Sequence, residues 1–154
     1  MTVASQRDVV FTPFMLRIRD VLDGADTAVP LRVRSSALRP VAQATDEWFY
    51  LRARSEQVIA EANAMLTGRT SLVDLEDEYG TGQLAFVLRR GDRSARICMG
   101  QTGRQGWVEL QRRYVDDVQP AEPEDQAVLE DLVVELLAES APPRNASPGT
   151  GEQR

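Results

Sequence analysis

The sequence contains no histidine and no lysine, and all 18 of its basic residues are arginine. Without histidine the chain cannot build the catalytic triads, zinc–histidine sites and proton shuttles that commonly operate near neutral pH. Without lysine it has no side chain for a Schiff base and no phosphate-loop lysine. We therefore expect a protein that is not an enzyme, with no catalytic residue, no metal site and no cofactor.

Cysteine is almost absent, because Cys98 is the only one. A single cysteine can form neither an intramolecular disulfide nor a cysteine-based zinc cluster, and it favours a reducing compartment. No apolar run approaches the ~20 residues that span a bilayer. Residues 1–10 contain no long apolar segment of the kind found in signal peptides. These features predict a cytoplasmic protein with no membrane association.

Negative charge is concentrated towards the C-terminal end of a chain whose net charge is -6. Residues 1–113 hold 16 arginines and 14 acidic residues, whereas residues 114–154 hold 2 arginines and 10 acidic residues. The arginine-rich part is thus close to neutral, which argues against a nucleic-acid-binding surface.

Three segments have the apolar spacing of helices. Thr12-Pro13 is a helix start, a capping hydroxyl followed by proline, and Gly24 ends that helix. A second helix is predicted from Asp46 to about Leu66, with Thr45 as its N-cap. A third is predicted from about residue 123 to residue 139. Its apolar stripe, opposite an acidic face, consists of Leu129, Leu132, Val133, Leu136 and Leu137.

Alternating apolar and polar residues predict strands at 31–35, 72–78, 83–90, 93–99 and 107–113. Proline at position 30 places the first of them at a sheet edge. The others are joined by short connections, which indicates antiparallel hairpins. We read GQTGRQG (100–106) as a hairpin loop.

A glycine-first turn at Gly91-Asp92 sets the register of the central hairpin. The pairs expected to face the helices are Phe86 with Ile97, Leu88 with Ala95, and Leu84 with Met99. The pairs expected on the outer face are Val87 with Arg96, Arg89 with Ser94, and Ala85 with Cys98. The preceding hairpin then places Leu75 against Phe86 and Asp74 diagonal to Arg89, so carboxylates of DLEDEYG (74–80) lie beside arginines.

These elements predict one α+β domain over residues 1–140, followed by a disordered tail over 141–154. The domain is a two-layer sandwich, in which an antiparallel four-to-five-stranded meander is packed by helices in the order α-β-α-β-β-β-β-α. In element order alone it is similar to small secretion-chaperone-like domains and toxin-neutralising immunity proteins. No residue is carried over from either group.

Six residues are candidates for binding. Trp107 is placed on the outer sheet face, where an exposed tryptophan is typical of an interface, unless a helix covers it. Arg90, Arg93 and Arg104 have no evident partner nearby in the sequence. Arg96 lies on the same face as Cys98 and could lower its thiol pKa, although a semi-buried structural cysteine is the preferred interpretation.

The sequence favours a non-enzymatic cytosolic protein-binding module: an adaptor, a chaperone-like protein or an inhibitor. It would act through the outer sheet face and the acidic last helix, with a protein partner and as a homodimer. The alternative is that sheet and loop arginines bind nucleic acid or another anionic ligand. That alternative uses Arg32, Arg34, Arg89, Arg90, Arg93, Arg96 and Arg104.

Overall fold

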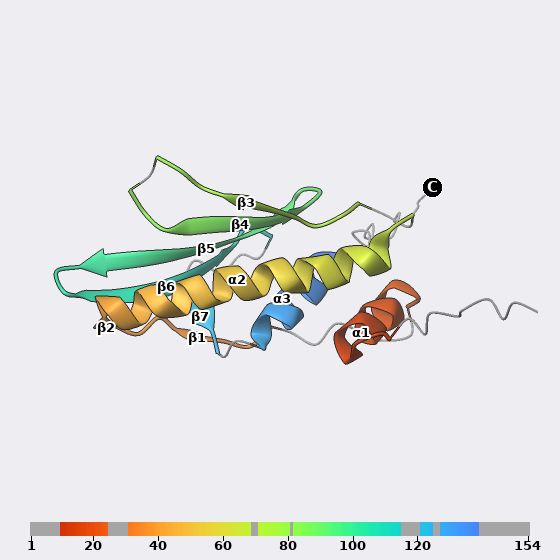
Figure 1. Cartoon of the computed structure of the whole chain (residues 1–154), viewed down its shortest axis with the longest axis horizontal. Coiled ribbons are helices and arrows are strands. Elements are labelled where there is room, and N and C mark those ends of the chain that lie inside the picture. Colours follow the sequence, from red (N-terminus) through yellow and green to blue (C-terminus); the bar gives the residue numbers. More distant parts are fainter. Residues whose placement is uncertain are drawn as a thin grey trace, which may run out of the picture.

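The computed structural model describes residues 10–24, 31–68, 71–80, 82–114, 121–124 and 127–138, so the predicted tail at 141–154 lies outside it. The described residues form three helices and one antiparallel sheet of seven strands (Figure 1). Six of the strands lie side by side in the order β1-β7-β6-β5-β4-β3, and the seventh strand, β2, pairs with β6 outside this row. The predicted α+β class is confirmed, with two more short strands than expected.

Helix α1 (Pro13–Leu22) begins where the sequence predicts. The hydroxyl of Thr12 accepts a hydrogen bond from the backbone N–H of Met15 at 3.1 Å. Phe14 and Ile18, one helical turn apart, are buried. Local signals were sufficient here because the cap and the proline act on the helix that they start.

Helix α2 (Val41–Leu66) begins five residues before the predicted start. The hydroxyl of Thr45 is not an N-cap, because it donates to the carbonyl of Val41 within the helix at 2.7 Å. Strand β2 (Arg39–Pro40) pairs with β6 immediately before the helix. The N–H of Val41 then donates to the carbonyl of Arg104 at 3.0 Å. The distant turn between β5 and β6 therefore satisfies one N–H group in the first turn of α2, and helix-capping patterns cannot reveal such a partner.

The central hairpin of β4 (Ala85–Arg90) and β5 (Arg93–Thr102) has the predicted register. Phe86 faces Ile97 and Val87 faces Arg96. Gly91 between the strands has φ +61°, the left-handed conformation that glycine adopts without strain.

The predicted register of β3 (Asp74–Asp77) on β4 is wrong by two residues. Leu75 faces Leu88 rather than Phe86, and Asp74 lies directly opposite Arg89. The connection between the strands is longer than the predicted pairing of Leu75 with Phe86 requires. The predicted faces are retained, because a shift of two residues preserves the alternation of a strand.

Strands β5 and β6 (Gln105–Arg112) continue through most of the glycine-rich stretch that was read as a loop. Only Gly103, with φ +60°, and Arg104 form the turn between them. Pairing of Gly100 with Trp107 and of Thr102 with Gln105 extends the hairpin.

Helix α3 (Val128–Leu137) begins later than predicted, because residues 121–123 form β7 instead. Strand β7 (Ala121–Pro123) pairs with β1 (Val33–Ser35), which is an edge strand as expected. The predicted apolar stripe of α3 is buried, and so are Val128 and Val134. Residue 139, where the helix was expected to end, lies outside the described residues.

One hydrophobic core lies between the inner sheet face and the helices (Figure 1). It includes Phe86, Leu88 and Ile97 from the sheet. Ala85, Val87 and Cys98 alternate with these residues, are buried, and lie outside that core on the opposite face. Within the described part of the chain, no helix is both long enough and apolar enough to cross a membrane.

Candidate functional site

Arg90 belongs to the structural interior rather than to a free basic surface. It is only 9% exposed, and its Nη1 donates to the carbonyls of Leu136 and Leu137 at 3.4 and 3.5 Å. Its Nε donates to the carbonyl of Ser71 at 3.1 Å. The carbonyls at a helix C-terminus lack intrahelical partners and attract cations. Arg90 therefore caps α3, which has no basic residue in its own last turn.

Arg93, in β5, also binds the C-terminal end of α3. Its Nη1 donates to the carbonyl of Glu135 at 2.7 Å and to that of Ala138. Its guanidinium carbon lies 5.2 Å from the centre of the Tyr114 ring, a cation–π distance. Arg90 and Arg93 were candidates for binding because no partner is evident near them in the sequence, but the α3 carbonyls that they bind lie more than 40 residues further along the chain.

The remaining hairpin arginines differ in their surroundings. On the outer face, Arg89 pairs with Glu76 and Arg96 with Glu78, each at 2.9 Å. The predicted cancellation of charge across the strands is therefore present. Arg104 is exposed at the tip of the β5–β6 turn, away from these pairs.

Trp107 lies on the outer sheet face, as predicted, and is partly buried there. A Cβ atom added to Gly100, its cross-strand neighbour, would be 2.1 Å from the indole ring. The ring therefore covers the bare backbone of Gly100. Among the described elements, the helices pack on the opposite face, so Trp107 is shielded by its own sheet.

Cys98 is buried on the outer face, with 2% of its surface exposed. Burial raises the pKa of its thiol above the ordinary value, and this effect outweighs the lowering by Arg96. A thiol held in its protonated form is a poor nucleophile. The preferred interpretation of Cys98 as a structural residue is thus supported.

The acidic residues of α3 are engaged by arginines from three other elements. Glu130 pairs with Arg54 at 3.0 Å and Glu135 with Arg112 at 2.7 Å. Asp131 pairs with Arg17 of α1. The acidic face predicted for this helix is thus engaged in intramolecular ion pairs at these three described residues.

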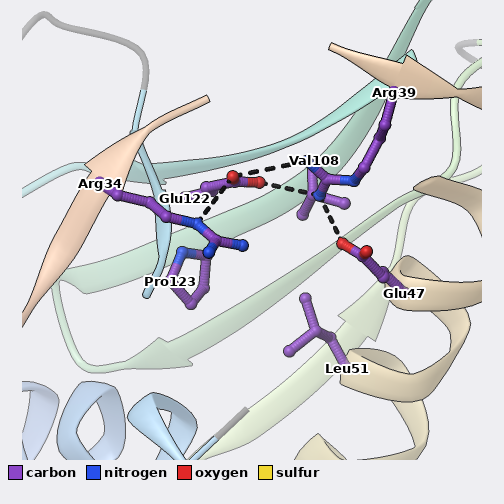
Figure 2. Close-up of a pocket in the computed structure, with 7 residues that line it drawn as sticks. All are labelled: Arg34, Arg39, Glu47, Leu51, Val108, Glu122 and Pro123. Atoms are coloured by element: carbon purple, nitrogen blue, oxygen red, sulfur yellow. Dashed lines mark hydrogen bonds and ion pairs between the residues drawn. The ribbon is translucent and has the colours of Figure 1, made fainter. Parts of the chain in front are cut away.

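A hollow of about 290 Å³ between α2, β1, β2, β6 and β7 contains an ionic cluster of Arg34, Arg39, Glu47 and Glu122 (Figure 2). The Glu122 carboxylate is almost fully buried and accepts hydrogen bonds from Arg34 Nε and Arg39 Nη2, each at 2.9 Å. Arg39 Nη2 also lies 2.5 Å from a carboxylate oxygen of Glu47. Two positive and two negative groups neutralise one another here, so the cluster ties the β1, β2 and β7 segments to α2.

A second hollow, of about 560 Å³, lies between α2 and the connection from β3 to β4. We call it the aromatic groove. Its lining consists of Trp48, Phe49, Arg52, Asp77, Glu78, Tyr79, Gly80, Gly82, Gln83, Leu84 and Ala85. Phe49 is 53% exposed and Tyr79 is 86% exposed, so both rings present apolar surface to solvent. Large exposed aromatic side chains beside a hollow are typical of interaction sites.

The walls of the aromatic groove are held in place by the core. The indole N–H of Trp48 donates to the carbonyl of Ile97 at 3.0 Å, and its ring meets Phe86 edge-on at 5.5 Å. The Phe49 ring packs edge-on against Trp48, with ring centres 5.1 Å apart. The aromatic groove is therefore preformed on its α2 side.

A bidentate ion pair joins the two walls. Arg52 Nε and Nη2 donate to the two carboxylate oxygens of Asp77, each at 2.7 Å. These hydrogen bonds lower the pKa of Asp77 below its ordinary value. A carboxylate with a lowered pKa is a weak general base at neutral pH, so the pair is suited to a structural role.

The aromatic groove was not predicted, although the sequence WFY (48–50) indicates exposed aromatic side chains. Successive helical residues lie 100° apart, so three consecutive aromatics cannot all face the core. Trp48 is buried, whereas Phe49 and Tyr50 are exposed. Tyr79 stands beside a turn glycine, where no core position was expected.

Comparisons with protein-family models, with curated proteins and with solved structures return no match. The similarity in element order noted above therefore carries no argument. The function has to be inferred from the groove and from the charges around it.

Proposed function

We propose that this protein is a non-enzymatic protein-binding module that receives an apolar segment of a partner protein in the aromatic groove. The observation that carries the proposal is the exposure of Phe49 and Tyr79 on opposite sides of a hollow whose α2 wall is preformed. Burying an aromatic side chain on binding contributes strongly to affinity, and a rigid wall reduces the entropy cost.

The site differs from the one that the sequence suggested. The outer sheet face is closed by Trp107 and by arginine–carboxylate pairs, and the described acids of α3 are paired. Arg89, Arg90, Arg93 and Arg96 have intramolecular partners as well. We therefore place partner binding in the aromatic groove and do not extend the proposal to nucleic acid.

The proposal includes a cytoplasmic location, supported by the single buried cysteine. A homodimer stays a prediction, and size-exclusion chromatography with light scattering would measure it.

The test is affinity capture from the native organism with wild-type protein and with a Phe49→Ser/Tyr79→Ser variant, followed by mass spectrometry. The matched control is Leu38→Ser/Leu72→Ser, which changes two exposed apolar residues that do not line the aromatic groove. A partner captured by wild type and by the control, but lost by the groove variant, is then purified and titrated directly. Equal binding of that partner to all three proteins would refute the proposal.

A further inference from the structure

Among the described residues, β3 is the last strand of the sheet, and no strand lies beside it on the edge that faces away from β4 (Figure 1). The N–H of Glu78 donates to the carbonyl of Ala85 at 3.0 Å. In an antiparallel pair, the main-chain N–H and C=O groups of successive residues alternate between bonding to the partner strand and pointing away from it. The main-chain groups of Glu76 and Asp74 therefore bond to β4, whereas those of Leu75 and Asp77 point away from the sheet. We call these outward groups the β3 edge.

The β3 edge has a defined beginning. The side-chain amide of Asn63 in α2 donates to the carbonyl of Val73 at 2.9 Å and accepts from its N–H at 2.8 Å. One side chain thus satisfies both outward groups of Val73, as a neighbouring strand would. From Leu75 onwards no described residue bonds to the outward main-chain groups, and the edge leads into the aromatic groove, which Asp77 and Glu78 line.

The side chains beside the β3 edge select the partner by charge and by polarity. Asp74 and Glu76 are exposed on the outer face, where Asp74 has no ion pair among the described residues and Glu76, 65% exposed, pairs with Arg89 across the strands. Glu78 follows on the same face and pairs with Arg96. Because an exposed pair is weak, Glu76 can exchange its arginine for a cation of an added strand. Leu75 lies on the inner face and packs against the core. In an added strand, successive side chains would lie alternately beside the acidic residues of the outer face and beside Leu75 of the inner face. Cationic and apolar residues should therefore alternate in that strand. A second copy of this edge is equally acidic, which disfavours pairing between two copies.

We infer that the β3 edge binds an extended peptide segment of a partner protein in which cationic and apolar residues alternate, by addition of a strand to the sheet. The inference rests on the proposed function, since the same partner would continue into the aromatic groove. The open edge is short, so main-chain hydrogen bonds alone would hold the segment weakly. The groove supplies the apolar contacts that complete the interaction.

The probe is a short synthetic peptide of alternating Arg and Val with blocked ends, titrated into the full chain at low salt and followed by amide hydrogen exchange. The expected result is slower exchange at the N–H groups of Leu75 and Asp77, because both acquire acceptors. Two further peptides carry N-methyl groups on all the arginines or on all the valines. One of these should bind at least about tenfold more weakly, because it lacks the N–H groups that donate to the carbonyls of Leu75 and Asp77.

Charge selection is tested with Asp74→Arg/Glu76→Arg, which should abolish binding of the Arg–Val peptide. The matched control is Asp92→Arg, a charge reversal at the exposed hairpin turn away from the edge, which should leave binding unchanged. A Glu–Val peptide should not bind the wild-type protein. Equal binding of both methylated peptides, or binding without protection of Leu75 and Asp77, would overturn the inference.

The two proposals fail in different ways. If the Arg–Val peptide binds and Phe49→Ser/Tyr79→Ser weakens it without protection at Leu75 and Asp77, the groove function stands and strand addition is excluded. If the edge amides are protected and the groove variant binds equally well, strand addition stands and the proposed role of the groove fails.

Discussion

Replacing Glu122 by glutamine should be one of the most destabilising conservative changes in this protein. The Glu122 side chain is 2% exposed and contacts Arg39, which is 11% exposed. Glutamine keeps the shape of the side chain but removes the charge. The Arg39 guanidinium would then remain buried with Glu47 as its only carboxylate partner among the described residues.

The magnitude follows from the burial of the pair. Removing one partner of a buried ion pair costs roughly 3–5 kcal/mol, because the other charge remains desolvated. We expect the lower end, about 3 kcal/mol, since Glu47 still balances Arg39 and the half-exposed Arg34 can turn to water. A domain of this size is stable by only about 5–15 kcal/mol, so the loss is a large fraction.

The double variant Arg39→Met/Glu122→Leu separates the charge effect from the loss of contacts. It removes both buried charges and fills the space with apolar atoms, so no desolvated charge remains between them. Apolar replacement of buried ion pairs is often neutral or stabilising. We therefore expect the double variant to be more stable than Glu122→Gln, even though it changes two residues.

The assay is urea unfolding, followed by circular dichroism and by the fluorescence of the buried Trp48. The matched control is Glu76→Gln, which breaks the exposed pair with Arg89 and should change the free energy of unfolding by less than about 1 kcal/mol. If Glu122→Gln costs no more than this control, or if the double variant is less stable than Glu122→Gln, the reasoning about buried charge is refuted.

Three further predictions concern other residues. Arg90→Met should cost about 1–3 kcal/mol of unfolding free energy in urea, since α3 loses one of the two arginines that cap it, whereas Arg104→Met should stay within about 0.5 kcal/mol; equal effects would contradict the capping role. Hydrogen bonds from Arg52 lower the pKa of Asp77 below its ordinary value, so this stabilisation is present above the unfolded-state pKa and is lost as the pH falls through the folded-state pKa; Asp77→Asn should therefore reduce the loss of stability in acid, and an unchanged pH profile would argue against it. Cys98 should react slowly with iodoacetamide at pH 8 until the protein is unfolded, and rapid labelling of the folded protein would disprove its burial.

Much of the fold could be predicted locally. The alternation of residues 84–99, with glycine at position 91, was enough to predict the register of β4 on β5, because a hairpin turn and the strands that it joins are adjacent in the chain. Thr12 and Pro13 likewise predicted the start of α1. The wrong helix starts arose where a distant segment supplied the partner, whereas the register of β3 on β4 was wrong because the connection between these strands is longer than expected. Strand β2, paired with β6, lies directly before an α2 that starts earlier than predicted, and β7, paired with β1, occupies the residues predicted for the start of α3.

The binding surfaces were beyond what local patterns can show. Arginine in a hairpin has the same sequence signature whether its charge meets water, a ligand or a helix end. Only the packing of α3 against the sheet brought its last carbonyls to Arg90 and Arg93. The aromatic groove and the β3 edge arise in the same way, from the placing of α2 alongside β3 through Arg52 and Asn63.

By itself the sequence determined the class of fold, the faces of the central hairpin and the chemistry that the chain lacks, since these depend on residue type and short spacing. The tertiary structure decided which charges are already paired and which apolar rings and main-chain groups remain open to a partner. The physical reason is that a charge is satisfied by whatever lies within a few ångströms in space, and that distance is unrelated to separation along the chain.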